Sequence, residues 1–147
     1  MGTYRHVLLA MDYSEDCLLV GQRARDIAER NGAKLTLLHV VEEVHISAGY
    51  ELLPLLPELP DESMMKEARQ ALERLAEKLG VADAERRAVS AVSTKEGIIN
   101  TAKEIGADLI VVGSHGRHGL ALLLGSTANA VLHAAPCDVL AVRIPPH

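Results

Sequence analysis

The hydrophobic residues of this chain form short continuous runs, separated by longer stretches in which apolar residues recur every three or four positions. Continuous runs of about five or six are typical of strands buried on both faces of a parallel sheet, and the second periodicity is typical of amphipathic helices. The runs that predict strands lie at residues 6–11, 34–41, 87–92, 108–112 and 137–142. In the third run polar and apolar residues alternate, which indicates an edge position in the sheet.

Four amphipathic stretches lie between these strands and predict helices. They cover residues 14–31, 61–79, 93–105 and 124–132, and a glycine follows each of the first three. Glycine is the commonest residue just after a helix, so these ends are well defined. The alternation predicts an α/β fold: an open, doubly wound, five-stranded parallel sheet with helices on both faces. We expect residues 1–147 to form a single domain.

The segment between residues 42 and 61 interrupts the alternation. Pro54, Pro57 and Pro60 stand among several leucines, a pattern that predicts neither a regular helix nor a strand. The segment is too apolar for an inert linker. Our hypothesis is a lid over a ligand cleft or a docking surface for a partner.

Composition excludes several classes of function. The chain has 15 Lys and Arg against 20 Asp and Glu and only 2% aromatic residues. A basic nucleic-acid footprint and an aromatic stacking platform are therefore not expected. No apolar stretch reaches the length of a membrane span, and the first residues lack a signal-peptide pattern. Cys17 and Cys137 suit a reducing compartment, so we expect the protein in the cytoplasm.

In doubly wound sheets, ligands bind at the carboxyl ends of the strands, where the strand order reverses. The first and fourth predicted strands end at Asp12 and Gly113. A loop with Gly116 follows and reaches residues 125–127, Gly-Ser-Thr, at the start of a helix. Close backbone approach, two hydroxyl groups and the positive end of a helix dipole favour phosphate. The loop is neither a P-loop nor a dinucleotide-binding glycine motif.

Several side chains near this loop have two interpretations. Asp12 either binds ribose hydroxyls or Mg²⁺, or accepts hydrogen bonds from the next helix start. The Arg117 guanidinium either reaches a phosphate or is solvated. His115 and His118 have no third ligand nearby in the sequence, so no metal site is predicted. His39, inside an apolar strand, is interpreted as a hydrogen-bonded structural residue.

Five segments together make the chain resemble the universal stress protein family over its whole length. They are residues 6–14, 37–41, 107–116, 123–128 and 135–143. The resemblance implies the strand order 3-2-1-4-5 and an adenine nucleotide, ATP, ADP or AMP, at the reversal of strand order. It also implies a homodimer formed through the last strand, with Val139, Leu140, Ala141 and Val142.

The resemblance also implies a role for each matching residue. Asp12 meets the ribose or the phosphates, main-chain groups of Val40 or Val41 meet the adenine edge, and Val112 and Gly113 meet the sugar. The residues that the resemblance implies as phosphate contacts are Gly116, Gly125, Ser126 and Thr127. In one respect the chain departs from the family: eight residues, not nine, separate Gly116 from Gly125. A surface loop usually absorbs a one-residue deletion.

These observations favour a nucleotide-binding regulatory protein of the stress response. No nucleophile and base are positioned as a catalytic set, so a dedicated enzyme is not indicated. Two alternatives remain open. One is a weak ATPase or a protein that phosphorylates itself. The other is a dimeric interaction protein in which the shortened loop no longer binds nucleotide.

Overall fold

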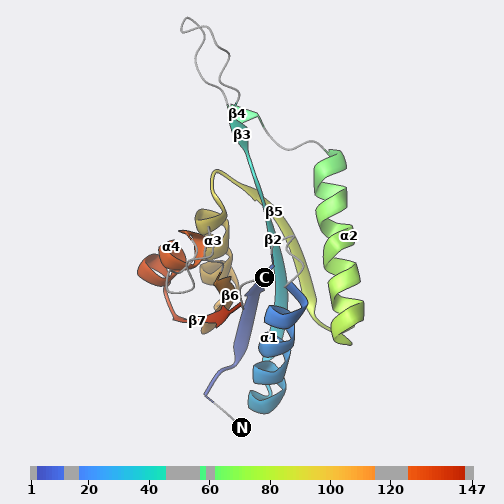
Figure 1. Ribbon diagram of the computed structural model, residues 1–147, viewed down its shortest axis with the longest axis vertical. Helices are drawn as coiled ribbons and strands as arrows, with labels where there is room; N and C mark the ends of the chain where they lie inside the picture. Colours follow the sequence, from blue (N-terminus) through green and yellow to red (C-terminus); the bar gives the residue numbers. More distant parts are fainter. Residues whose placement is uncertain (1–2, 12–16, 46–56, 59–61, 115–125, 145–147) are drawn as a thin grey trace, which may run out of the picture.

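The computed structural model describes residues 3–11, 17–45, 57–58, 62–114 and 126–144 (Figure 1). Strands and helices alternate along most of the chain, as the hydrophobic pattern predicts. In chain order the elements are β1 (His6–Ala10), α1 (Cys17–Asn31), β2 (Lys34–Glu42), β3 (Val44–His45), β4 (Pro57–Glu58), α2 (Glu62–Leu79), β5 (Glu85–Ala91), α3 (Thr94–Ile105), β6 (Leu109–Ser114), α4 (Ser126–Ala134) and β7 (Asp138–Arg143).

The main sheet has five parallel strands in the order β5-β2-β1-β6-β7. With the two-residue strands β3 and β4 set aside, this is the expected order 3-2-1-4-5. In the central strand β1, Leu8 pairs with Thr36 of β2 and with Ile110 of β6. The strand with alternating polar and apolar residues, β5, lies at an edge of the sheet, which confirms that prediction.

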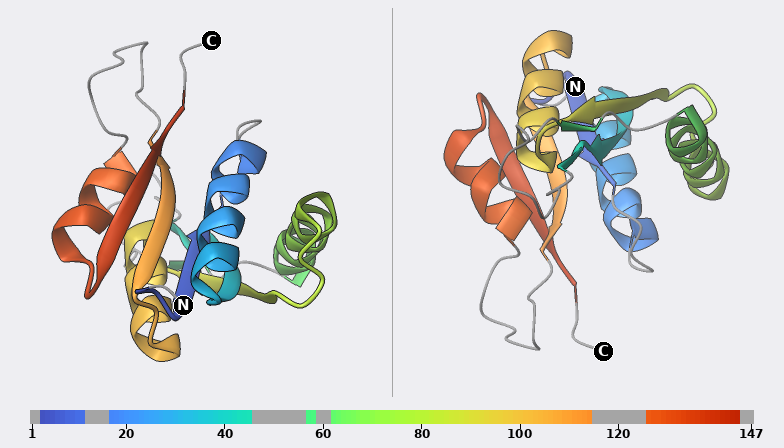
Figure 2. Two further views of the ribbon diagram at one scale, coloured as in Figure 1. Left: turned by 90° about the horizontal axis from the view of Figure 1, so that it is seen from below. Right: turned by 90° about the horizontal axis from the view of Figure 1, so that it is seen from above.

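Helices cover both faces of the sheet, so the fold is doubly wound (Figure 2). Side chains alternate across β1: Val7 and Leu9 pack on the side of α1 and α2, and Leu8 packs on the side of α3 and α4. All three side chains are fully buried. The continuous apolar run of β1 thus supplies two hydrophobic cores, one on each face.

The ends of α3 illustrate how the sequence sets helix boundaries. The Ser93 side chain accepts a hydrogen bond from the Glu96 main-chain N–H at 3.2 Å. At the other end Gly106 adopts φ 69°, a left-handed conformation that costs glycine little. Both ends agree with the predicted helix.

Polar contacts of Asp108 and Thr36 hold the amino end of β1. The Asp108 carboxylate accepts hydrogen bonds from the main-chain N–H of Arg5 at 2.9 Å and of His6 at 3.0 Å. Although burial opposes it, this bonding lowers the pKa of Asp108. His6 Nε2 lies 2.7 Å from Oγ1 of Thr36, which is fully buried, and burial lowers the pKa of His6. These contacts join β1 to its neighbours on both sides.

The proline-rich segment differs from the prediction at its ends. We expected neither helix nor strand between residues 42 and 61, but β3 and β4 pair there as antiparallel strands. Val44 pairs with Glu58, and His45 pairs with Pro57. Residues 46–56 and 59–61, on which the hypothesis of a lid or docking surface depends, lie outside the described residues.

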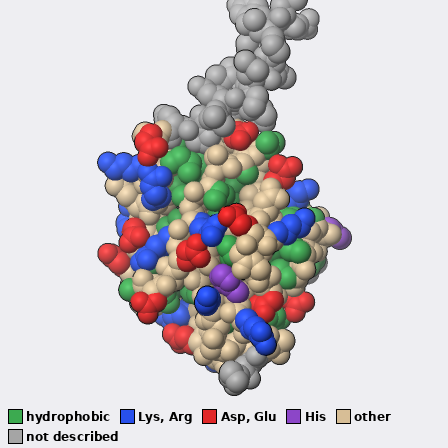
Figure 3. Space-filling view, turned by 180° about the vertical axis from the view of Figure 1, so that it is seen from behind, with side chains coloured by type: hydrophobic (Ala, Val, Ile, Leu, Met, Phe, Trp, Pro, Cys, Tyr) green, Lys and Arg blue, Asp and Glu red, His purple; other side chains and the backbone are tan. Residues whose placement is uncertain are grey.

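Figure 3 shows acidic and basic side chains interspersed over one face of the molecule. On this face, the described residues form no continuous basic surface of the kind that binds nucleic acid. Among the helices that the structure describes, none combines the length and the hydropathy needed to cross a membrane.

Candidate functional site

The strand order reverses between β1 and β6. From β1 the chain runs through α1 to β2 and then to β5, and it returns through α3 to β6 on the other side of β1. The pairing of β1 with β6 ends at Leu9 and Val111, whereas β6 continues to pair with β7 as far as Ser114 and Arg143. The carboxyl ends of β1 and β6 are therefore not joined by main-chain pairing. This is the position at which ligands bind in doubly wound sheets.

Four of the predicted contact residues lie at this edge of the sheet. Val40 and Val41 are near the carboxyl end of β2, and both are 8% exposed. Val112 and Gly113 are near the carboxyl end of β6, where Gly113 pairs with Val142 of β7. Since β1 lies between β2 and β6, Val40 and Val41 lie on one side of β1, and Val112 and Gly113 lie on the other.

The predicted phosphate contacts are described only in part. Ser126 is the first residue of α4 and Thr127, which is exposed, is the second. The fold brings this helix end to the same edge as the carboxyl end of β6, because α4 leads back to a strand parallel to β6. The remaining predicted residues, Asp12, Gly116, Arg117 and Gly125, lie outside the described residues.

A cavity of about 280 Å³ lies beside the carboxyl end of β2, against α2. Its size is near the lower end of the range of small-molecule pockets, roughly 300–1,000 Å³. The cavity is lined by His39, Val40, Val41, Glu42, Met64 and Glu67. Two of the predicted contact residues thus border open space.

His39 holds the chain at the end of β1. Its side chain is 5% exposed, and its Nδ1 lies at hydrogen-bond distance, 3.3 Å, from the main-chain oxygen of Met11. The Met11 N–H donates to the Leu38 carbonyl at 2.8 Å. This confirms that His39 is hydrogen-bonded, as a histidine in an apolar strand must be. The partner residue, Met11, immediately precedes Asp12 in the chain. This contact between β2 and the end of β1 could not be predicted from the sequence.

Glu42 occupies the amino end of α3, a role that the sequence did not indicate. Its Oε1 accepts hydrogen bonds from the Thr94 N–H at 3.1 Å and the Thr94 Oγ1 at 2.6 Å. A carboxylate therefore already neutralises the positive end of this helix dipole. In contrast, the first turn of α4 contains no acidic residue. Of these two helix ends, α4 is the one that suits an external anion.

Ser114, the last residue of β6, is tied to the neighbouring strand. Its Oγ donates a hydrogen bond to the Val142 carbonyl at 3.1 Å. This bond ties the end of β6 to the end of β7. Among the residues that the structure describes, no group of three His, Cys, Asp or Glu is placed to hold a metal ion. His115 and His118 lie outside them.

Sequence comparisons identify the family that this chain resembles. Residues 3–143 match the model of the universal stress protein family. Universal stress protein A homolog 1 of Coxiella burnetii is 42% identical over 140 residues, which are 95% of this chain and 96% of that protein. Homolog 2 of the same organism is 39% identical over 98% of both chains.

Solved structures show the same fold. A crystal structure of a universal stress protein in complex with cAMP has a TM-score of 0.71 and 25% identity, with 96% of this chain and 98% of that chain covered. The universal stress protein of Archaeoglobus fulgidus in complex with dAMP has a TM-score of 0.64 and 20% identity, with 94% and 97% covered. The chain therefore belongs to the universal stress protein family.

Proposed function

We propose that this protein binds an adenine nucleotide at the carboxyl edge of its sheet and acts as a regulatory protein in a stress response. The observation that carries the proposal is the position of Val40, Val41, Val112 and Gly113 on the two strands that flank β1 at the reversal of strand order. A family member of the same fold is described in complex with cAMP, which supports an adenine nucleotide as the ligand.

In this proposal each end of the nucleotide meets a different strand. The adenine edge bonds to main-chain groups of Val40 or Val41, beside the cavity at the end of β2. The sugar lies against Val112 and Gly113 at the end of β6. Asp12 meets the ribose or, through Mg²⁺, the phosphates.

The phosphates bind at the glycine loop and the amino end of α4. Their contacts are Gly116, Gly125, Ser126 and Thr127, with Arg117 on the loop as a further cation. The electrostatics of the described residues support this placement. Glu42 already occupies the amino end of α3, and no acidic residue opposes an anion in the first turn of α4.

The proposed role is regulation through binding rather than catalysis. Nucleotide occupancy would change the surface that a partner protein meets in the cytoplasm. The protein would act as a homodimer that pairs through β7. This strand lies at an edge of the sheet, and pairing with its symmetry mate would cover its free main-chain groups.

A calorimetric titration tests the proposal. Nucleotide-stripped protein is titrated with ATP and Mg²⁺, beside Gly116→Leu to block the loop and Lys103→Leu as a control at an exposed position on α3. Micromolar binding in the parent and the control, lost in Gly116→Leu, supports the proposal. Absence of binding by the parent contradicts it and favours the dimeric interaction protein. Turnover of ATP, or a gain of mass by one phosphate, favours the weak ATPase or self-phosphorylating protein.

A further inference from the structure

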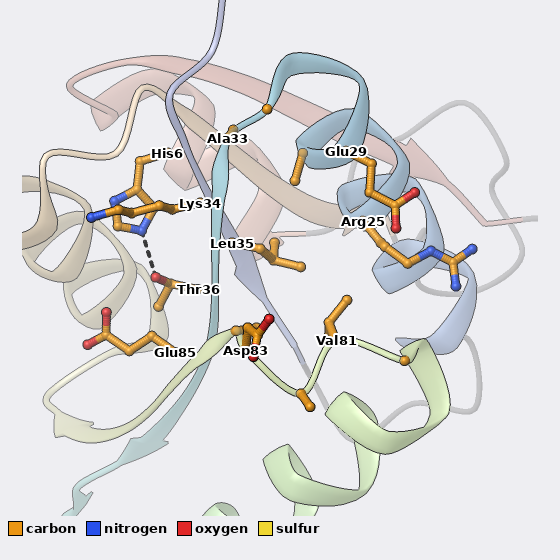
Figure 4. Close-up of a pocket in the computed structure, with 15 residues that line it drawn as sticks. His6, Arg25, Glu29, Ala33, Lys34, Leu35, Thr36, Val81, Asp83 and Glu85 are labelled. Carbon is orange, nitrogen blue, oxygen red and sulfur yellow. Dashed lines mark hydrogen bonds between the residues drawn. The ribbon is translucent and has the colours of Figure 1, made fainter.

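A second and larger cavity, of about 570 Å³, lies at the opposite, amino edge of the sheet (Figure 4). It is formed where α1 and α2 end, beside the first residues of β1, β2 and β5. The volume is well within the range of small-molecule pockets. The nucleotide proposal uses none of the residues that line it.

The carboxyl ends of two helices border this cavity, and Arg30 and Lys78 in their last turns balance part of the negative charge of these ends. A glycine with left-handed conformation follows each of α1 and α2, Gly32 at φ 64° and Gly80 at φ 69°, and both glycines line the cavity. The carboxyl end of a helix carries about half a negative charge. The chain itself already brings a cation to one of these ends, because Arg25 Nη1 donates to the Leu79 carbonyl at 3.1 Å.

The charged side chains around the cavity are only partly paired. Arg25 contacts Asp26 at 3.4 Å, and Glu85 is bonded to Arg87 at 2.6 Å. Within the part of the chain that the structure describes, Glu29, Asp83 and Lys34 form no ion pair. Two carboxylates and one ammonium group thus remain unpaired, so these side chains are negative on balance.

Between these charged groups the cavity wall is aliphatic. Figure 4 shows Leu35 and Val81 between Glu29 and Arg25 on one side and His6, Lys34 and Glu85 on the other. The small side chains Ala28, Ala33, Ala82 and Ala84 complete this wall. His6, on the same side of the cavity as Lys34, is hydrogen-bonded to Thr36. Burial keeps the pKa of His6 below its ordinary value. The site therefore offers anionic groups beside a stretch of hydrocarbon.

We propose that this amino-edge cavity binds a small aliphatic diamine, with one ammonium group at Glu29, the other at Asp83, and the hydrocarbon chain between them over Leu35 and Val81. Charge complementarity argues for a cation, because the unpaired side chains that line the cavity, two carboxylates against one ammonium group, are negative on balance. The aliphatic wall argues for a hydrocarbon stem rather than a hydrated metal ion.

Titration with 1,5-diaminopentane, followed by backbone amide shifts of the full chain, tests the proposal. Two five-carbon compounds serve as controls: glutarate, which is negatively charged, and 1,5-pentanediol, which is neutral. The diamine is expected to cause saturable shifts in residues 28–36 and 79–85, and the other two compounds are not. Equal shifts with glutarate or the diol would overturn the proposal, and so would the absence of saturable shifts at about 10 mM diamine, since a Kd of 1 mM corresponds to only about −4.1 kcal/mol.

Variants test whether the carboxylates of Glu29 and Asp83 bind the diamine. The double variant Glu29→Gln and Asp83→Asn is expected to weaken diamine binding by roughly three- to tenfold, the worth of two exposed ion pairs. Glu77→Gln is the control, because Glu77 is an exposed residue in the last turn of α2 that does not line the cavity. An equal loss in both variants would mean that overall charge attracts the amine, and would refute the site. Nucleotide titration of each variant provides a separate check on folding.

Discussion

A Cβ atom on Gly97 would lie 2.6 Å from Cγ1 and 2.7 Å from Cγ2 of Val40. Only glycine therefore lets α3 approach β2 this closely without a shift. Val40 is buried in the core on this face of the sheet, so its side chain has little space in which to turn away. Gly97 thus sets the position of the strand end that we propose to bind adenine.

The variant Gly97→Ala is expected to shift β2 against α3. Overpacking of this kind costs about 1–3 kcal/mol of unfolding free energy. We expect ATP affinity to fall as well, by up to about tenfold, or 1.4 kcal/mol. Urea denaturation and calorimetry measure the two effects.

Gly21→Ala is the matched control for this prediction. A Cβ there would meet Leu79 Cδ1 at 2.9 Å, at the end of a flexible side chain on the other face of the sheet. We expect ATP affinity in this variant to stay within about twofold of the parent. If Gly97→Ala also binds ATP as the parent does while losing stability, the position of Val40 does not govern binding.

The contact between Glu42 and Thr94 is expected to stabilise the start of α3. Glu42→Gln removes the charge at the helix end and should lower the free energy of unfolding by about 1 kcal/mol. Thr94→Val should cost a similar amount, and the double variant should cost less than the sum, because both changes break one contact. Urea denaturation measures all three.

Glu43→Gln serves as the control for Glu42→Gln. This variant removes one negative charge from the residue next to Glu42. The main-chain N–H of Glu43 donates to the Ala91 carbonyl, and the substitution leaves that bond unchanged. The control should be nearly neutral. Additive losses in the double variant would show that the two side chains act independently.

His6 predicts a dependence of stability on pH. Its pKa is lower in the folded protein than in the unfolded chain, where it is about 6.5. As the pH falls below about 6.5, the unfolded chain binds a proton before the folded protein does, so the free energy of unfolding should decrease. Above that pH the contribution of His6 is fully present. Urea denaturation across a pH series measures the slope.

His6→Gln should flatten this slope below about pH 6.5. A further decrease below about pH 4 should remain in this variant. It comes from Asp108, whose pKa is lowered, so its stabilisation is present above the unfolded pKa and is lost at lower pH. An unaltered slope in His6→Gln would contradict the assignment to His6.

The proposed pairing of β7 with its symmetry mate predicts the oligomeric state. Leu140→Lys should convert a dimer into a monomer in sedimentation, because it places a charge on the paired edge. Leu140 also packs against the core, so the variant's unfolding transition must be recorded to show that it is folded. A dimer formed by folded Leu140→Lys would refute this interface.

The strands and helices of the main sheet follow from local patterns. The continuous apolar run of β1 predicted a central strand, because a strand buried on both faces is apolar at every position. The alternation of polar and apolar residues in β5 predicted an edge strand, because such a strand is buried on one face only. The two-residue strands β3 and β4 could not be predicted, since so short a pairing leaves no periodicity. Only the fold brings their residues together.

The candidate site was predictable to a similar extent. Val40, Val112 and Gly113 were predicted at the carboxyl edge of the sheet, where the structure has them, because parallel strands all end on the same side. The contact of Glu42 with Thr94, 52 positions away, depends on the order of β2 and α3 in space. No local pattern marks it, and the same holds for the bond between His39 and Met11.

The central claim is that an adenine nucleotide binds at the carboxyl edge of the sheet, and backbone amide shifts during titration with ATP test it most directly. The account predicts saturable shifts at residues 10–11, 39–42, 112–114 and 126–128, with residues 32–36 and 80–85 at the amino edge unchanged. Shifts confined to the amino edge, or none at millimolar ATP, would contradict it.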